Sequence, residues 1–188
     1  MSITPMARGG SAPDEYIDLF VHLATGSEVN LVEDDDGCRA IIPDATTATG
    51  VDWTAIGFDD STWPLSGLLG VGYDTRSDYN PYFGVDVIAM RSSDESCYIR
   101  VPFTIDGGID LADVESLTLK MRYDDGFVAY LNGMKIAEDR APVSPVWNSG
   151  ATSSHDDDDP VGFWDFSAYA GLAVPVSGTH SRTSTHLT

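Results

Sequence analysis

The sequence predicts an all-β protein, a sandwich of short antiparallel strands. No segment of the 188-residue chain keeps apolar side chains at the three- and four-residue spacing of an amphipathic helix. Several short segments instead alternate apolar and polar residues, and turn residues or long irregular loops separate them. Two of these segments meet at Asn132-Gly133, a dipeptide typical of two-residue hairpins because both positions of a type I′ turn need positive φ.

The best-defined strands are 96–105 and 115–123. Their odd-numbered positions are apolar from Cys97 and from Leu117 onward, so these side chains share one face of each strand. The acidic turn Asp124-Asp125-Gly126 then leads into the two hairpin strands. Further strands are expected at 29–33, 38–42, 67–73 and 161–166, and segment 16–24 is apolar and β-capable, with a short helix as the alternative.

Glycines interrupt one of these expected strands. Gly67, Gly70 and Gly72 fall within segment 67–73. A glycine inside a strand commonly marks a bulge or a place where another backbone comes close. We therefore expect one of these two features in this segment.

The domain organisation is predicted to be one domain with an extension at each end. The chain is long enough for a real core, and 42% of its residues are hydrophobic, which argues against a disordered protein. Residues 1–28 are expected to be a flexible arm, because the first fifteen are rich in Gly, Ser, Pro and Ala. The sandwich is assigned to 29–173, and 174–188 to a disordered or irregular tail.

The charge excludes some partners. Lys and Arg number 10 against 30 Asp and Glu, which gives a net charge of −20 and argues against nucleic acid and anionic membrane surfaces. This balance fits a secreted, salt-tolerant or calcium-loaded protein, or it only keeps the protein soluble. No segment is long enough to span a bilayer, and 16–24 contains Asp18 and His22 without a basic segment before it, so it is not a signal peptide.

Two cysteines, Cys38 and Cys97, are too few for a disulfide framework. They could form one bridge in an oxidising compartment if the geometry allows it. The alternative is that both are small buried apolar residues.

Two long loops, 74–90 and 141–160, carry most of the candidate ligand-binding residues. Sugar sites combine an aromatic platform with carboxylate, amide or guanidinium groups that bind hydroxyls. The alternative for the aromatic residues is that they pack as lids over the sandwich. The candidates are Tyr79 and Tyr82 in the first loop, Trp147 and Asn148 in the second, and Arg122 and Asp124, which flank the central turn and could face the same end.

Paired aspartates are the candidate metal ligands, because calcium prefers carboxylate and carbonyl oxygens on turns. Four acidic turns offer such ligands, at 34–36, 59–60, 124–125 and 156–159, and none has the spacing of an EF-hand loop. The predicted ligands are Asp59, Asp60, Asp124 and Asp125. The alternative is that these side chains cap nearby backbone N–H groups in their turns.

The chain lacks the common catalytic motifs. We find no nucleophile elbow, no phosphate-cradling loop and no His-Glu-x-x-His pattern. The four histidines are scattered, two of them in the tail. We therefore expect a protein without enzymatic activity.

Five motifs occur in one order along the chain and carry a resemblance to a known family. They are Trp53-x-x-x-x-Phe58-Asp59-Asp60-Ser61-x-Trp63, Gly70-x-Gly72-Tyr73, Cys97-Tyr98-Ile99-Arg100-Val101-Pro102-Phe103, residues 123–133 and Trp147-Asn148. This set resembles the galactose-binding-like jelly-roll modules of secreted multidomain proteins and hydrolases from environmental bacteria. It is also similar to the sugar-binding jelly roll of β-galactosidases, and the similarity covers 38–172.

The resemblance implies a jelly-roll β-sandwich of about eight antiparallel strands with long loops, in an extracellular setting. It also implies frequent carbohydrate binding and, on a loop, a structural calcium ion. The function expected from it is a non-catalytic carbohydrate-binding or adhesion module, possible partners being a polysaccharide or glycan.

One departure from the family pattern concerns the end of the sandwich. Similar modules finish with a strongly apolar strand, whereas this chain has only Ala173-Val174-Pro175-Val176. Pro175 cannot donate to a β-ladder. An unfilled strand position is a template for pairing, and segment 16–24 is the obvious segment to fill it, either within its own chain or in a neighbouring copy. The alternative function is therefore a self-assembling subunit of a filament or surface layer, joined to other copies by strand exchange of the arm. The alternative to an unfilled position is a truncated or shifted C-terminus with a frayed tail.

Overall fold

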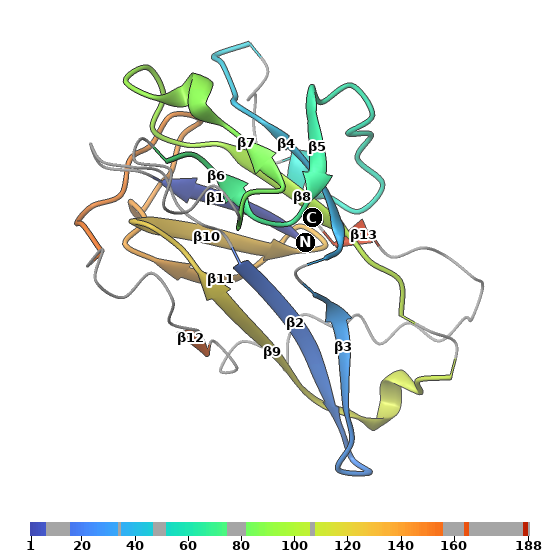
Figure 1. Cartoon of the computed structure of the whole chain (residues 1–188). Helices are drawn as coiled ribbons and strands as arrows, with labels where there is room; N and C mark the ends of the chain where they lie inside the picture. The colour runs from blue at the N-terminus through green and yellow to red at the C-terminus, as the bar shows by residue number, and fades with distance from the viewer. Residues whose placement is uncertain are drawn as a thin grey trace.

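The computed structural model describes residues 1–6, 16–33, 35–46, 52–74, 82–105, 108–155, 164–165 and 186–187. These residues form antiparallel sheets joined by loops and short 3-10 turns (Figure 1). The predicted all-β class is confirmed. The strands are β1 Ser2–Met6, β2 Tyr16–Leu23, β3 Glu28–Val32, β4 Gly37–Ile41, β5 Leu65–Leu68, β6 Val71–Gly72, β7 Val85–Asp86, β8 Tyr98–Pro102, β9 Val114–Arg122, β10 Gly126–Leu131, β11 Met134–Asp139, β12 Trp164–Asp165 and β13 His186–Leu187. The 3-10 turns are η1 Asp52–Thr54, η3 Ile88–Met90 and η4 Leu111–Asp113.

Within these ranges the strands form two main sheets and one small pair. The larger sheet has the order β11-β10-β1-β8-β4-β5, and β13 also pairs with β8. The second sheet has the order β12-β9-β2-β3. A short parallel pair, β6 and β7, forms a small sheet of its own.

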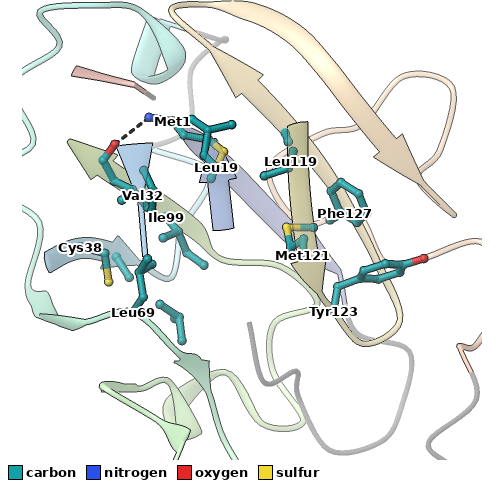
Figure 2. Packing of buried hydrophobic residues seen from close by; sticks show 14 of the residues in the cluster. Met1, Leu19, Val32, Cys38, Leu69, Ile99, Leu119, Met121, Tyr123 and Phe127 are labelled. Atoms are coloured by element: carbon teal, nitrogen blue, oxygen red, sulfur yellow. Dashed lines mark hydrogen bonds between the residues drawn. The ribbon is translucent and has the colours of Figure 1, made fainter. Parts of the chain in front are cut away.

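One hydrophobic core joins the two main sheets. Leu19 on β2 and Met121 on β9 come from the smaller sheet, and Ile99 on β8 and Phe127 on β10 come from the larger one. All four are fully buried and belong to the same cluster (Figure 2). The architecture is therefore sandwich-like, with the apolar faces of both sheets turned toward each other.

The alternating segments behave as predicted. The odd-numbered positions Cys97 to Phe103 and Leu117 to Tyr123 are all buried in the main core. The hairpin is also confirmed: β10 and β11 pair with Leu131 opposite Met134, and the turn residues Asn132 and Gly133 both have positive φ, 52° and 83°. Local sequence therefore determines these elements.

The N-terminal arm is the main difference from expectation. Residues 2–6 form β1, which pairs with five residues of β10 and two of β8 and so lies in the middle of the larger sheet. The flexible arm predicted for this segment is thus wrong at residues 1–6, and residues 7–15 lie outside the described part of the chain. Composition could not reveal this strand, because its backbone is paired by partners about a hundred residues away.

Met1 anchors the start of β1. Its side chain is fully buried, its α-amino group donates a hydrogen bond to the Val101 carbonyl at 2.7 Å, and the Val101 N–H donates to the Met1 carbonyl at 2.9 Å (Figure 2). Burial lowers the pKa of this amine well below its ordinary value of 8.0, because the charged form loses its hydration.

Segment 16–24 is a strand, as one of its two interpretations predicted. β2 lies in the smaller sheet between β9 and β3. It pairs within its own chain and occupies a different sheet from β1. Of the irregular tail, only β13 is described, and it pairs with Val101 and Pro102.

The two cysteines are buried thiols, which agrees with the second alternative. The register of β4 with β8 places Arg39 opposite Arg100 and Ile41 opposite Tyr98. Cys38 and Cys97 are therefore offset by four residues along these strands, or about 13 Å. A disulfide needs Cα atoms within about 7 Å, so these two thiols do not meet in this fold.

Candidate functional site

The turn between β9 and β10 brings together several of the predicted ligand-binding residues. Arg122 ends β9, and its guanidinium carbon lies 5.8 Å from the ring centroid of Tyr82. Arg122 is half-buried, whereas the Tyr82 side chain is 60% exposed. The pair therefore presents an aromatic ring beside a cation at the surface, a geometry in which the ring quadrupole attracts the guanidinium.

Asp124 follows Arg122 by two residues, and its carboxylate is near enough to buried Tyr73 to affect the pKa of that phenol. Burial raises the pKa of Tyr73 first, the negative charge of Asp124 raises it further, and the positive charge of Arg91 opposes both. The Tyr73 hydroxyl thus lies in the field of one carboxylate and one guanidinium and stays protonated at neutral pH. Together these groups supply hydrogen-bond donors and acceptors around the turn.

Close backbone packing holds the Tyr82 segment in place. Gly70 has φ of 92° and its carbonyl accepts hydrogen bonds from Gly84 and Val85, at 2.8 and 3.0 Å. A Cβ on Gly70 would overlap the Tyr82 carbonyl oxygen, and a Cβ on Gly67 would overlap the Gly84 carbonyl oxygen. The close approaches predicted from the glycines of segment 67–73 are therefore present.

A hydrogen-bonded network supports the inner side of the turn. Buried Tyr123 donates its hydroxyl proton to Asp139, and Arg140 donates to the same Asp139 carboxylate at 2.8 Å. The pKa of Tyr123 is raised, first by burial and then by this acceptor. Buried Asp125 accepts the backbone N–H of His155 at 2.8 Å, which ties the loop after β11 to the turn.

Trp147 and Asn148 are held by a separate set of contacts. Trp147 is half-buried and packs against the aromatic cluster of Trp53, Trp63 and Tyr98. Its carbonyl accepts the Ser96 hydroxyl at 2.6 Å, and the Asn148 side chain accepts the Glu95 N–H at 2.6 Å. These contacts match the alternative in which Trp147 covers the sandwich as a lid.

The carboxylates predicted to bind calcium are engaged in other ways. Asp60 accepts a hydrogen bond from the Arg100 Nε at 2.9 Å, and Arg39 lies 3.6 Å from its other oxygen. Asp59 accepts from the backbone N–H of Ser61 at 3.0 Å, and hydrogen bonds from Ser61 lower its pKa. The turn-capping alternative therefore describes Asp59.

Within the described part of the chain, no group of three or more His, Cys, Asp or Glu side chains is close enough together to hold a metal ion. Asp59-Asp60 and Asp124-Asp125 therefore belong to no such group among the described residues. A guanidinium already neutralises Asp60, and Asp125 is turned toward His155. Calcium stays a prediction from the sequence.

The predicted binding residues that the structure describes thus fall into two groups with different contacts. Tyr82, Arg122 and Asp124 gather at the turn, Trp147 and Asn148 support a loop, and Tyr79 lies outside the described residues. Sequence reasoning did not find Tyr73 and Arg91, because only the fold brings them to this turn.

Buried tyrosines give the protein a predicted alkaline limit. Burial raises the pKa of Tyr98 to about 12 and raises that of Tyr130, compared with an ordinary value of 10.0. Because the pKa is higher in the folded than in the unfolded protein, the protonated tyrosines stabilise the fold. Their contribution to the free energy of unfolding is intact below pH 10 and is lost as the pH rises toward 12. Urea unfolding across this range, with phenolate absorbance followed in parallel, tests the prediction.

The matched variant is Tyr98→Phe, which keeps the ring that stacks on Trp53 at 4.1 Å and removes the hydroxyl. It should lose less stability than the wild type above pH 10. Equal losses in the two proteins would contradict the role assigned to Tyr98.

The fold and site define this chain as an all-β, sandwich-like protein with an exposed polar and aromatic turn. Comparison with protein-family models, curated proteins and solved structures finds no match to it. No helix among the described residues is long and apolar enough to cross a membrane.

Proposed function

We propose that this protein is a non-catalytic, extracellular carbohydrate-binding or adhesion module of the galactose-binding-like jelly-roll type. A saccharide is bound at the β9–β10 turn by Tyr82, Arg122 and Asp124. The observation that supports this proposal is the exposed Tyr82 ring beside Arg122. An aromatic face packs on the apolar C–H groups of a sugar ring, while guanidinium and carboxylate groups bind its hydroxyls.

The electrostatics favour a neutral saccharide. A net charge of −20 repels anionic polymers over the protein as a whole. Hydroxyl groups can accept from Arg122 and donate to Asp124 without bringing a charge of their own. The buried network beneath the turn limits its movement, and such preorganisation reduces the cost of binding. Calcium has no part in this proposed contact.

The proposal predicts a selective loss of binding. Neutral glycans on an array are first screened with the wild-type protein, and the best ligand is then titrated by calorimetry. Tyr82→Ala should raise its Kd about tenfold or more, because a stacked aromatic residue contributes about 1 to 2 kcal/mol. Met134→Ala is the control, since Met134 is also exposed, at 49%, but lies on β11.

Two outcomes would contradict the proposal. One is the absence of binding to any glycan, and the other is a Kd that Tyr82→Ala leaves unchanged. Trp147→Ala separates the two groups of predicted residues, because Trp147 packs on the Trp53 cluster. Trp147→Ala should clearly lower the midpoint of unfolding, and it should raise the Kd for the glycan less than Tyr82→Ala does.

A second candidate function is a self-assembling structural subunit. It is favoured by one specific observation: β1, a strand from the end of the chain, lies in the middle of the larger sheet. A strand in this position can be exchanged between copies if another copy supplies the same segment.

A further inference from the structure

We infer that the space between β10 and β8, here called the acceptor slot, takes residues 1–6 of a second copy of this chain. The inference rests on the second candidate function and specifies its mechanism. It replaces segment 16–24, the donor expected from sequence, with β1. The reason is that β2 pairs with β9 and β3 inside the smaller sheet.

The acceptor slot is formed entirely by other parts of the chain. Its walls are β10 and β8, and without β1 the larger sheet would divide into β11-β10 and β8-β4-β5. β1 fills it through five pairings with β10, from Ser2 opposite Tyr130 to Met6 opposite Gly126, and two with β8. An empty slot would expose ladder donors and acceptors on both walls, which strongly favours occupation by some strand.

The acceptor slot makes specific contacts with Met1, the residue that precedes β1. Met1 buries its whole side chain in the main core and exchanges two backbone hydrogen bonds with Val101, at 2.7 and 2.9 Å. The same contacts are made whether the strand comes from its own chain or from a second copy. The difference in free energy between the two forms then depends mainly on the connector and on protein concentration.

The connector sets the geometry of exchange. Residues 7–15 join β1 to β2, with Met6 opposite Gly126 and Tyr16 opposite Arg122. Both ends of the connector therefore lie at the β9–β10 turn. From Met6 to Tyr16 the chain can reach at most about 35 Å, so exchanging copies must approach each other within that distance at this end of the sandwich.

Concentration should control which form is populated. A connector of nine residues gives the strand an effective concentration on the order of mM in its own slot. Refolding at μM concentration should therefore give monomers, and refolding near mM concentration should give exchanged forms. Reciprocal exchange closes a dimer, whereas exchange in one direction builds a filament.

Disulfide trapping in the full chain tests the inference. Thr4 lies opposite Val128 in the register of β1 and β10, so Thr4→Cys and Val128→Cys are made as separate variants that carry tags of different mass. The two are unfolded, mixed, refolded from urea at total concentrations from about 1 μM to about 1 mM, and oxidised. The expected result is a disulfide-linked heterodimer whose fraction rises with concentration.

Two controls make the result decisive. Thr4→Cys mixed with Met134→Cys measures chance oxidation, because Met134 is exposed on β11 and has no pairing with β1. The double variant T4C/V128C should close its disulfide within one chain at the lowest concentration. Failure of that closure would show that β1 does not occupy the slot and would overturn the inference.

The inference is also overturned if the double variant closes but no heterodimer exceeds the Met134→Cys control at any concentration. A heterodimer supports the exchange, and electron microscopy of the same sample then tests the function. If only closed dimers form, the strand-exchange inference is supported, but the function as a subunit of a filament or surface layer is contradicted.

Discussion

Replacing Arg100 with alanine is expected to lower the free energy of unfolding by about 3 to 5 kcal/mol. Arg100 lies on β8 with only 2% of its surface exposed, and its Nε donates to Asp60 at 2.9 Å. Its other nitrogens donate to the carbonyl groups of Trp53, Ala55 and Phe58. One side chain therefore fastens residues 53–60 to the larger sheet.

The loss is large because several acceptors around one buried guanidinium lose their partner together. Burial lowers the pKa of Arg100, since desolvation disfavours its charged form, and Asp60 counteracts this effect. Removal of the guanidinium leaves Asp60 and the loop carbonyl groups without that donor, and a buried group without its partner costs about 1 to 3 kcal/mol. The aromatic cluster of Trp53 and Trp63 would lose its alignment as well.

Arg39→Ala is the matched control. Arg39 approaches the same Asp60 carboxylate at 3.6 Å, but its side chain is 39% exposed. An exposed ion pair contributes at most about 1 kcal/mol, so this variant should be nearly as stable as the wild type. Urea unfolding of both variants checks the prediction. Similar losses in the free energy of unfolding would show that the contribution of Arg100 to stability does not depend on its burial.

Gly70→Ala is the second change with a large expected effect, a loss of about 2 to 4 kcal/mol in the free energy of unfolding. Gly70 has φ of 92°, which strains any residue with a Cβ, and the added methyl group would overlap the Tyr82 carbonyl oxygen. The backbone that carries Tyr82 must therefore move.

Gly57→Ala isolates the steric part of this effect. Gly57 has a similar φ of 81°, but nothing lies within 4 Å of a Cβ built there. Gly57→Ala should lower the free energy of unfolding by about 1 to 2 kcal/mol, through backbone strain alone. Thermal or urea unfolding measures the stability of both variants. Equal losses of stability would show that overlap with the Tyr82 carbonyl adds nothing to the destabilisation by Gly70→Ala.

Gly70→Ala also separates fold from function. If saccharide binds at Tyr82, the surviving folded protein should bind it more weakly, whereas Gly57→Ala should leave the Kd unchanged. A folded Gly70→Ala protein with normal affinity would argue against a site at Tyr82 without affecting the structural prediction.

The site was only partly predictable for a physical reason. Tyr82, Arg122 and Asp124 were recognisable by residue type and by their place beside turns and loops, and the fold brings them together. Arg91 and Tyr73 carry no local signal, because their proximity to Asp124 depends on the tertiary structure. Trp147 was recognisable as an aromatic loop residue, but only packing against Trp53 distinguishes a lid from a platform.

Local sequence by itself determined the all-β class, the buried faces of β8 and β9 and the Asn132-Gly133 hairpin. Each follows from a period of two or from the φ preference of one or two residues, and such properties belong to a single short segment. Only the tertiary structure decided that Arg100 holds a loop, that Asp60 is its partner and that residues 2–6 fill the middle of a sheet. These depend on partners 40 to more than 120 residues away in sequence, and a segment carries no local record of which partner will satisfy its backbone or its charge.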